Sequence, residues 1–195
     1  MQSRIFKLFV TVGAIASVAV LSSCGDPTAL RAQRDNLVDQ AVIFALNGTP
    51  TTLPSGLRLS SRQAIRVDAN FAFDLAFDIN ENNEVVVYTQ RMIGNQLVVG
   101  HPVGLQITEQ SFDAITRAPV TGYKYDSLVV LPGNRVLLVD NVDPVCGQQF
   151  SILGPNLRAK VRLDSVVLSD RAMFITFLVN RNCGFRGLSP GLPAD

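Results

Sequence analysis

The chain has 195 residues, with 17 Lys and Arg against 16 Asp and Glu, so its formal net charge is +1. No block of like charge occurs, and a chain so balanced has no global field to gather nucleic acid, so no nucleic-acid partner is expected. A length of this order suits one domain whose hydrophobic core needs neither metals nor dense disulfides.

The N-terminal segment has the three parts of a secretory signal. Arg4 and Lys7 precede an uncharged run over residues 8–21, and small residues follow it. The run has 14 residues, whereas a transmembrane helix needs about 20 to match the hydrocarbon core of a bilayer. The pattern therefore predicts a cleaved signal peptide over residues 1–23 rather than a membrane span.

The end of this segment, Leu21, Ser22, Ser23 and Cys24, resembles the lipobox of bacterial lipoproteins. The resemblance implies that the Cys24 sulfur takes a diacylglycerol and that its freed amine takes a further acyl chain, such as palmitate. The alternative is an unmodified signal-peptide cysteine. Two or more acyl chains would anchor the protein durably in the cell envelope. The family's sorting rule keeps proteins with Asp after the lipidated Cys at the inner membrane; Gly25 stands there, which implies the outer membrane in a diderm cell.

The segment after Cys24 is ambiguous between helix and strand. Residues 28–46 carry apolar side chains at helical spacing, yet Val42, Ile43 and Phe44 favour a strand. We expect a lipidated tether over residues 24–40 that includes a short helix to about residue 40, followed by a strand.

Alternation of apolar and polar residues dominates the rest of the chain. Residues 71–79 place large apolar side chains on one face and Asp74 and Asp78 on the other, which predicts a half-buried antiparallel strand. Residues 157–164 alternate in the same way, and residues 172–179 are apolar on both faces, as in a central strand. About nine or ten such strands, without interleaved helices, predict a mainly β, antiparallel two-sheet β-sandwich, with a β-barrel as the alternative.

Turn residues predict how the strands connect. Pro132, Gly133 and Asn134 separate residues 128–131 from residues 136–139, which predicts a hairpin. A further short strand is expected over residues 97–99. We therefore expect a single β domain over residues 41–187 and a flexible tail over residues 188–195.

Cys146 and Cys183 remain once Cys24 is acylated. An exported compartment permits oxidation, so the pair predicts one structural disulfide. A redox or metal pair is the alternative, but no Cys-x-x-Cys spacing and no second ligand cluster accompany these residues. No cofactor is therefore expected.

Two features bear on catalysis by a nucleophile or a base. Residues 187–191 spell Gly-x-Ser-x-Gly around Ser189, but Pro190 lacks the backbone N–H that a nucleophile elbow uses in its oxyanion hole. His101 is the one histidine of the chain and lies in a Gly-His-Pro corner, which favours a turn over a general base or metal ligand. Neither feature predicts an enzyme.

A calcium site is the one metal site that the sequence suggests. Asp78, Asn80, Asn82 and Glu84 place oxygen ligands at alternate positions, as at the start of a calcium-binding loop. The loop's Gly and its bidentate Glu are both missing downstream. A polar hairpin turn explains the same residues, and the sequence favours that interpretation.

Two groups of residues are candidate contact surfaces. Tyr123 and Tyr125 lie two apart and so share one face of a strand, either exposed or at the edge of the core. Arg158, Lys160 and Arg162 form a basic stripe that is expected to point outward, as a solvated face or a contact for phosphate groups.

The sequence favours a lipid-anchored interaction module of the cell envelope that binds an envelope protein or polymer through strand faces or loops. The alternative is an envelope hydrolase whose carboxylates, such as Asp113, Asp126 or Asp143, are brought together only by the fold. A structural subunit that hides an apolar face in an oligomer is a third interpretation.

Overall fold

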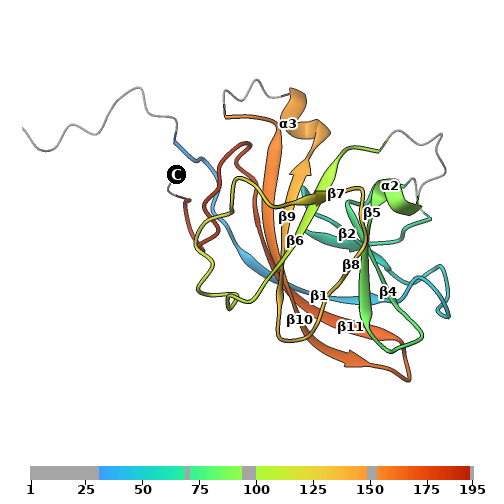
Figure 1. Cartoon of the computed structure of the whole chain (residues 1–195). Coiled ribbons are helices and arrows are strands. Elements are labelled where there is room, and N and C mark those ends of the chain that lie inside the picture. Colours follow the sequence, from blue (N-terminus) through green and yellow to red (C-terminus); the bar gives the residue numbers. More distant parts are fainter. Residues whose placement is uncertain (1–30, 69–70, 94–99, 149–152, 194–195) are drawn as a thin grey trace, which may run out of the picture. The chain divides into compact units, whose positions relative to one another are not determined.

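A computed structural model describes residues 31–68, 71–93, 100–148 and 153–193 (Figure 1). Ala32–Asp195 forms one compact unit, and the fold below is the fold of that unit. The predicted signal peptide, Cys24 and the predicted strand over residues 97–99 lie outside the described residues.

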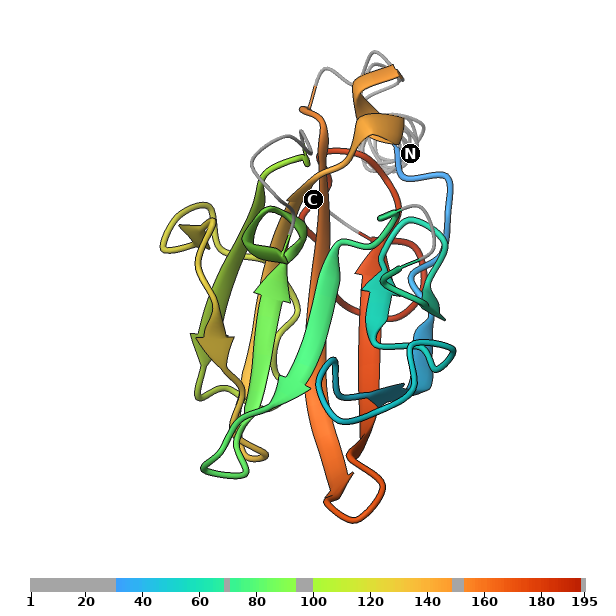
Figure 2. The same ribbon diagram turned by 90° about the vertical axis from the view of Figure 1, so that its right-hand side faces the viewer.

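Two antiparallel sheets make up the fold, and they face each other (Figures 1 and 2). In spatial order, the six-stranded sheet contains β1 (Val38–Phe44), β11 (Ala172–Asn180), β10 (Asn156–Val167), β9 (Val136–Val142), β6 (Val103–Thr108) and β7 (Lys124–Tyr125). The five-stranded sheet contains β3 (Gln63–Ile65), β2 (Gly56–Arg58), β4 (Leu75–Ile79), β5 (Val85–Thr89) and β8 (Val129–Val130). Two short helices, α2 (Gln90–Ile93) and α3 (Pro144–Gln148), follow β5 and β9.

The main core lies between the sheets and follows the period of two in the sequence. From β10 it takes Ala159, Val161 and Leu163, which the alternation places on one face. The facing strand β4 contributes side chains that are 0–3% exposed, namely Leu75, Phe77 and Ile79. The predicted β-sandwich is thus confirmed, and because the described strands form two separate sheets, the barrel alternative is wrong.

A second apolar cluster covers the outer face of the six-stranded sheet. Leu138 of β9 and Leu178 of β11 point into it, and Phe112 and Ile115 of the β6–β7 connection lie over them together with Leu188. Leu188 is fully buried, and its backbone N–H donates to the Thr116 carbonyl at 2.7 Å. The described part of the predicted flexible tail, residues 188–193, therefore belongs to the fold, and that prediction is wrong.

Strand β4 is buried on both faces, which corrects the prediction of a half-buried strand. Asp74 just before it and Asp78 within it are only 2% and 5% exposed. Each carboxylate accepts hydrogen bonds, Asp74 from the backbone N–H of Leu59 and Asp78 from the side chain of Arg171. The alternation marked the inner face correctly, but these partners, distant in sequence, bury the polar face as well.

The predicted short helix to about residue 40 is also wrong. From Val38 onward the chain is strand β1, which pairs antiparallel with β11 from Val38 opposite Leu178 to Phe44 opposite Ala172. The strand extends from residues 42–44 towards the N-terminus because β11 offers backbone hydrogen-bond partners as far as Val38. Tertiary pairing has overridden the helical stripe.

The predicted hairpin around Pro132 is wrong as well. Strand β8 pairs with β5 in the five-stranded sheet, whereas β9 pairs with β6 and β10 in the other sheet. The turn of residues 132–134 therefore carries the chain from one sheet to the other. Turn chemistry predicted the reversal of direction but not the change of partner.

The described helices are both short. None of those within the described residues is long and apolar enough to cross a membrane.

Candidate functional site

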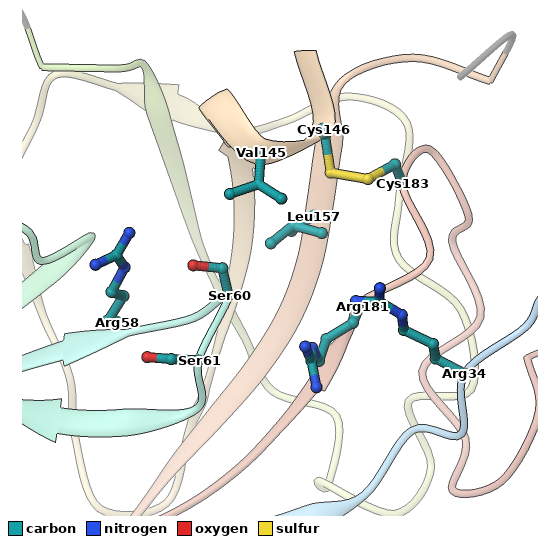
Figure 3. Close-up of a pocket in the computed structure, with 9 residues that line it drawn as sticks. All are labelled: Arg34, Arg58, Ser60, Ser61, Val145, Cys146, Leu157, Arg181 and Cys183. Atoms are coloured by element: carbon teal, nitrogen blue, oxygen red, sulfur yellow. A yellow bond between two sulfur atoms is a disulfide. The ribbon is translucent and has the colours of Figure 1, made fainter. Parts of the chain in front are cut away.

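A cavity of about 270 Å³ opens at one end of the sandwich, and we call it the arginine pocket (Figure 3). Three arginines and two serines supply its polar lining, and the disulfide forms part of its wall. Figure 3 shows Arg34 and Arg181 on one side and Arg58 with the serines on the other. The lining residues are Arg34, Arg58, Ser60, Ser61, Val145, Cys146, Leu157, Arg181 and Cys183.

Elements from both sheets bring these side chains together. Arg58 ends β2 and the serines follow it, while Arg181 comes directly after β11. Arg34 is held beside Arg181 by the side chain of Asn182. Asn182 Oδ1 accepts hydrogen bonds from the backbone N–H groups of Gln33 and Arg34 at 2.8 and 3.0 Å. Asn182 Nδ2 donates a hydrogen bond to the Arg34 carbonyl at 2.8 Å.

The predicted disulfide between Cys146 and Cys183 is present, with Cα atoms 5.5 Å apart. It joins α3 to the segment after β11, so it fixes two walls of the arginine pocket relative to each other (Figure 3).

The pocket is electropositive and its charges are uncompensated. Within the described part of the chain, no carboxylate lines it, and Arg34, Arg58 and Arg181 form no ion pair. Burial lowers the pKa of Arg181, and the nearby positive charges of Arg34 and Arg62 lower it further. Guanidinium groups bind carboxylate and phosphate oxygens through paired N–H donors, so this arrangement is suited to an anion.

A second cavity of about 260 Å³, which we call the histidine pocket, adjoins the first, because Arg58 and Val145 line both. In it His101 Nε2 lies 2.7 Å from Asp74 Oδ1. The other oxygen of Asp74 accepts the backbone N–H of Leu59 at 2.6 Å. The described residues that line it are Arg58, Ala72, Asp74, Gln90, His101, Asp143, Pro144 and Val145.

The predicted tyrosine surface is only partly exposed. Tyr125 is 44% exposed, and its hydroxyl donates to Asp140 Oδ2 at 2.6 Å. Burial and this hydrogen bond raise the pKa of Tyr125 to about 12. Tyr123 packs against the second cluster, and burial raises its pKa. Asp140 also pairs with Arg158, so these residues form a connected polar group rather than a flat aromatic patch.

The predicted outward basic stripe is wrong for two of its three residues. Lys160 is 2% exposed, and its Nζ donates to the carbonyls of Phe112 and Ile115 at 2.6 and 2.9 Å. Burial lowers its pKa, an effect partly offset by Asp113. The Arg158 side chain is 12% exposed and is held by Asp140. Only Arg162, 41% exposed at the side chain and paired with Asp164, has the expected environment.

The calcium candidates form a hairpin turn between β4 and β5. Asn80 Oδ1 accepts the backbone N–H groups of Asn82 and Glu84, each at 2.9 Å, and Asn83 has a φ of +61°. Asp78 instead turns towards Arg171. Within the described ranges, no three His, Cys, Asp or Glu side chains lie close enough together to hold a metal ion.

The carboxylates of the hydrolase alternative have different partners. Asp126 pairs with Arg91 at 3.2 Å, and Asp143 Oδ1 accepts the backbone N–H of Val145 at 2.7 Å at the start of α3. Asp113 lies in the β6–β7 connection near Lys160. Ser189 lies in the C-terminal segment, whose backbone pairs with Asn36, and not at a strand-to-helix elbow.

Sequence reasoning missed Arg34, Arg58, Arg181 and Asp74 as site residues. The three arginines stand far apart in the chain: Arg34 in the segment before β1, Arg58 at the end of β2 and Arg181 directly after β11. No local spacing marks such residues, because only the pairing of strands brings their side chains together.

Comparison with known proteins adds no family to these observations. No family model matches the chain, and neither a curated protein nor a solved structure is significantly similar to it. The function has to be argued from a two-sheet β-sandwich with an arginine-lined pocket at one end.

Proposed function

We propose that the protein is a lipid-anchored interaction module of the bacterial cell envelope that binds an acidic group of an envelope polymer or protein. The observation that carries the proposal is the arginine pocket, where Arg34, Arg58 and Arg181 line one cavity and the described residues add no carboxylate to its lining.

Electrostatics supports an anionic ligand. Burial lowers the pKa of Arg181, and repulsion by the nearby charges of Arg34, which also lines the pocket, and of Arg62 lowers it further. An anion between the guanidinium groups removes the repulsion and gains charge-assisted hydrogen bonds. Ser60 and Ser61 add hydroxyl donors to the same cavity.

The sequence supports the membrane anchor. The lipobox-like residues before Cys24 imply acylation at that cysteine, and Gly25 after it implies sorting to the outer membrane in a diderm cell. Arg34 follows Cys24 by ten residues, which even when fully extended span at most about 35 Å. An acylated Cys24 would therefore keep the arginine pocket close to a bilayer surface.

Calorimetric titration of the full chain, purified in non-ionic detergent, with inorganic phosphate tests the pocket. We expect saturable binding that Arg181→Ala weakens by about 10-fold to 100-fold, because a charge-assisted hydrogen bond is lost. Arg117→Ala is the matched control, since Arg117 is an exposed arginine outside the pocket lining. Equal affinities for the wild type and Arg181→Ala would contradict the proposal.

Cell fractionation tests the anchor separately. Cys24→Ala should move the protein from the membrane pellet to the soluble fraction, because the acceptor sulfur is gone. A Cys24→Ala variant that stays in the pellet would show that acylation of this cysteine does not anchor the chain.

A further inference from the structure

We infer that the arginine pocket and the histidine pocket form one extended site for a phosphorylated saccharide, with the phosphate at the arginines and a sugar hydroxyl at His101. This inference rests on the proposed function and adds the class of ligand and a second binding residue.

Continuity of the two cavities is the first support. Arg58 and Val145 line both, and the cavities have similar volumes of about 270 and 260 Å³. A ligand that contacts Arg58 can therefore extend into both cavities. The combined site is longer than a single inorganic anion needs.

The charge of the arginine pocket favours phosphate over carboxylate. A phosphate monoester carries about −1.5 to −2 charges at neutral pH and three acceptor oxygens. Three guanidinium groups, with no acidic side chain among the described lining residues, match that charge more closely than they match the single charge of a carboxylate. The serine hydroxyls can donate to the remaining oxygens.

The geometry of His101 leaves one of its nitrogens for a ligand. Asp74 is 2% exposed, and one of its oxygens accepts the Leu59 N–H while the other faces His101 Nε2. Because Nε2 is engaged by the Asp74 carboxylate, the second ring nitrogen, Nδ1, is the one that a ligand hydroxyl can use as a hydrogen-bond partner. Nδ1 has no hydrogen-bond partner among the described residues.

The surroundings of His101 suit a hydroxyl-bearing ligand. The His101 side chain is 17% exposed and lines the histidine pocket, so a group that enters that cavity can contact it. A sugar hydroxyl can form a hydrogen bond with Nδ1, because a hydroxyl both donates and accepts. The C–H face of a sugar ring can pack on Val145, which lines both parts of the site.

Two phosphate monoesters of equal charge test the inference by calorimetric titration of the full chain. Wild type should bind glucose 6-phosphate about 3-fold to 10-fold more tightly than methyl phosphate, because one additional neutral hydrogen bond strengthens binding by about that factor. His101→Ala should lower the ratio of the two affinities, because only glucose 6-phosphate loses a hydrogen bond. Arg181→Ala should weaken the binding of both.

A second measurement needs no variant. His101 is the only histidine of the chain, so an untagged protein gives a single imidazole C2 proton resonance in NMR spectra. Saturating glucose 6-phosphate should shift this resonance further than saturating methyl phosphate does.

The outcomes separate the inference from the proposed function. If methyl phosphate binding depends on Arg181 but glucose 6-phosphate binds no more tightly and does not shift the His101 resonance further, the extended site is wrong and the anion site stands. If neither compound requires Arg181, both are wrong.

Discussion

Lys160 shows how a charged side chain can be part of a protein interior. Its aliphatic stem crosses the second apolar cluster, and its ammonium group reaches two backbone carbonyls and lies 4.4 Å from the centre of the Phe112 ring. The carbonyls and the ring together replace water around the cation. Lys160 thereby fastens the β6–β7 connection to strand β10.

Replacing Lys160 should therefore cost stability. Lys160→Ala removes a buried stem and leaves two carbonyls without a donor, so we expect a loss of about 3 kcal/mol in the free energy of unfolding, measured with urea. Lys124→Ala, at an exposed position in β7, should change it by less than about 0.5 kcal/mol. Equal effects of the two substitutions would contradict the buried position of Lys160.

Tyr125 should titrate late. Its pKa is raised from 10.0 to about 12 by burial and by the hydrogen bond to Asp140. Because the pKa is higher in the folded chain than in the unfolded chain, the protonated Tyr125 hydroxyl contributes to the free energy of unfolding. This contribution is complete below pH 10.0 and is lost as the pH rises through about 12. The difference in tyrosinate absorbance between wild type and Tyr125→Phe should have its midpoint near the higher value. A midpoint near 10.0 would contradict this environment.

At the residue scale, the sequence predicted which side of β10 faces the main core but not what covers the other side. Alternation places Arg158 and Lys160 opposite Ala159 and Val161, as observed. It cannot reveal that the β6–β7 connection and the C-terminal segment lie over that outer face, because those contacts join residues far apart in the chain.

The described residues after β11, 181–193, act as a structural element although they form no strand of either sheet. Gly191 exchanges backbone hydrogen bonds with Asn36, and Leu188 fills the second apolar cluster. The segment thus ties the start of β1 to the cover of the six-stranded sheet.

Two leucines of this segment give a matched test. Leu188 is 0% exposed and Leu192 is 62% exposed. Leu188→Ala should lower the free energy of unfolding by about 2 to 5 kcal/mol, through lost burial and a cavity, and Leu192→Ala by less than about 0.5 kcal/mol. If the two variants unfold at the same urea concentration, residues 188–193 form a loose tail after all.

At the element scale, long periodic strands were predictable and short ones were not. Strands β10 and β11 have 12 and 9 residues and follow their sequence patterns closely. Strand β8 has two residues, so its place in the five-stranded sheet depends on pairing with β5 and not on its own sequence. For β1, the pairing with β11 decided between two local preferences.

For the whole molecule, the disulfide links the stability of the sandwich to the shape of the arginine pocket. It closes a loop with a sequence separation of 37 and lies in the pocket wall. The double substitution Cys146→Ser and Cys183→Ser should lower the free energy of unfolding by about 2 to 5 kcal/mol. It should also weaken phosphate binding, whereas a variant with unchanged phosphate affinity would show that the wall needs no crosslink.

The architecture and the disulfide were predictable because they depend on patterns of many residues and on the chemistry of one cysteine pair. The arginine pocket was not, because each of its arginines is unremarkable in its own segment. Only the folded chain places the end of β2, the residue after β11 and the segment before β1 around one cavity.

The central claim is that Arg34, Arg58 and Arg181 bind an anion together, and the melting temperature of the full chain tests it most directly. A ligand that binds only the folded state raises this temperature. Phosphate also stabilises folded proteins without a binding site, because it is excluded from their surface. At constant ionic strength, replacing chloride by phosphate should therefore raise the melting temperature of wild type and of Arg117→Ala clearly more than that of the triple variant Arg34→Ala, Arg58→Ala and Arg181→Ala. An equal rise in all three proteins would mean that phosphate acts elsewhere on the molecule and that the arginine pocket is not the binding site.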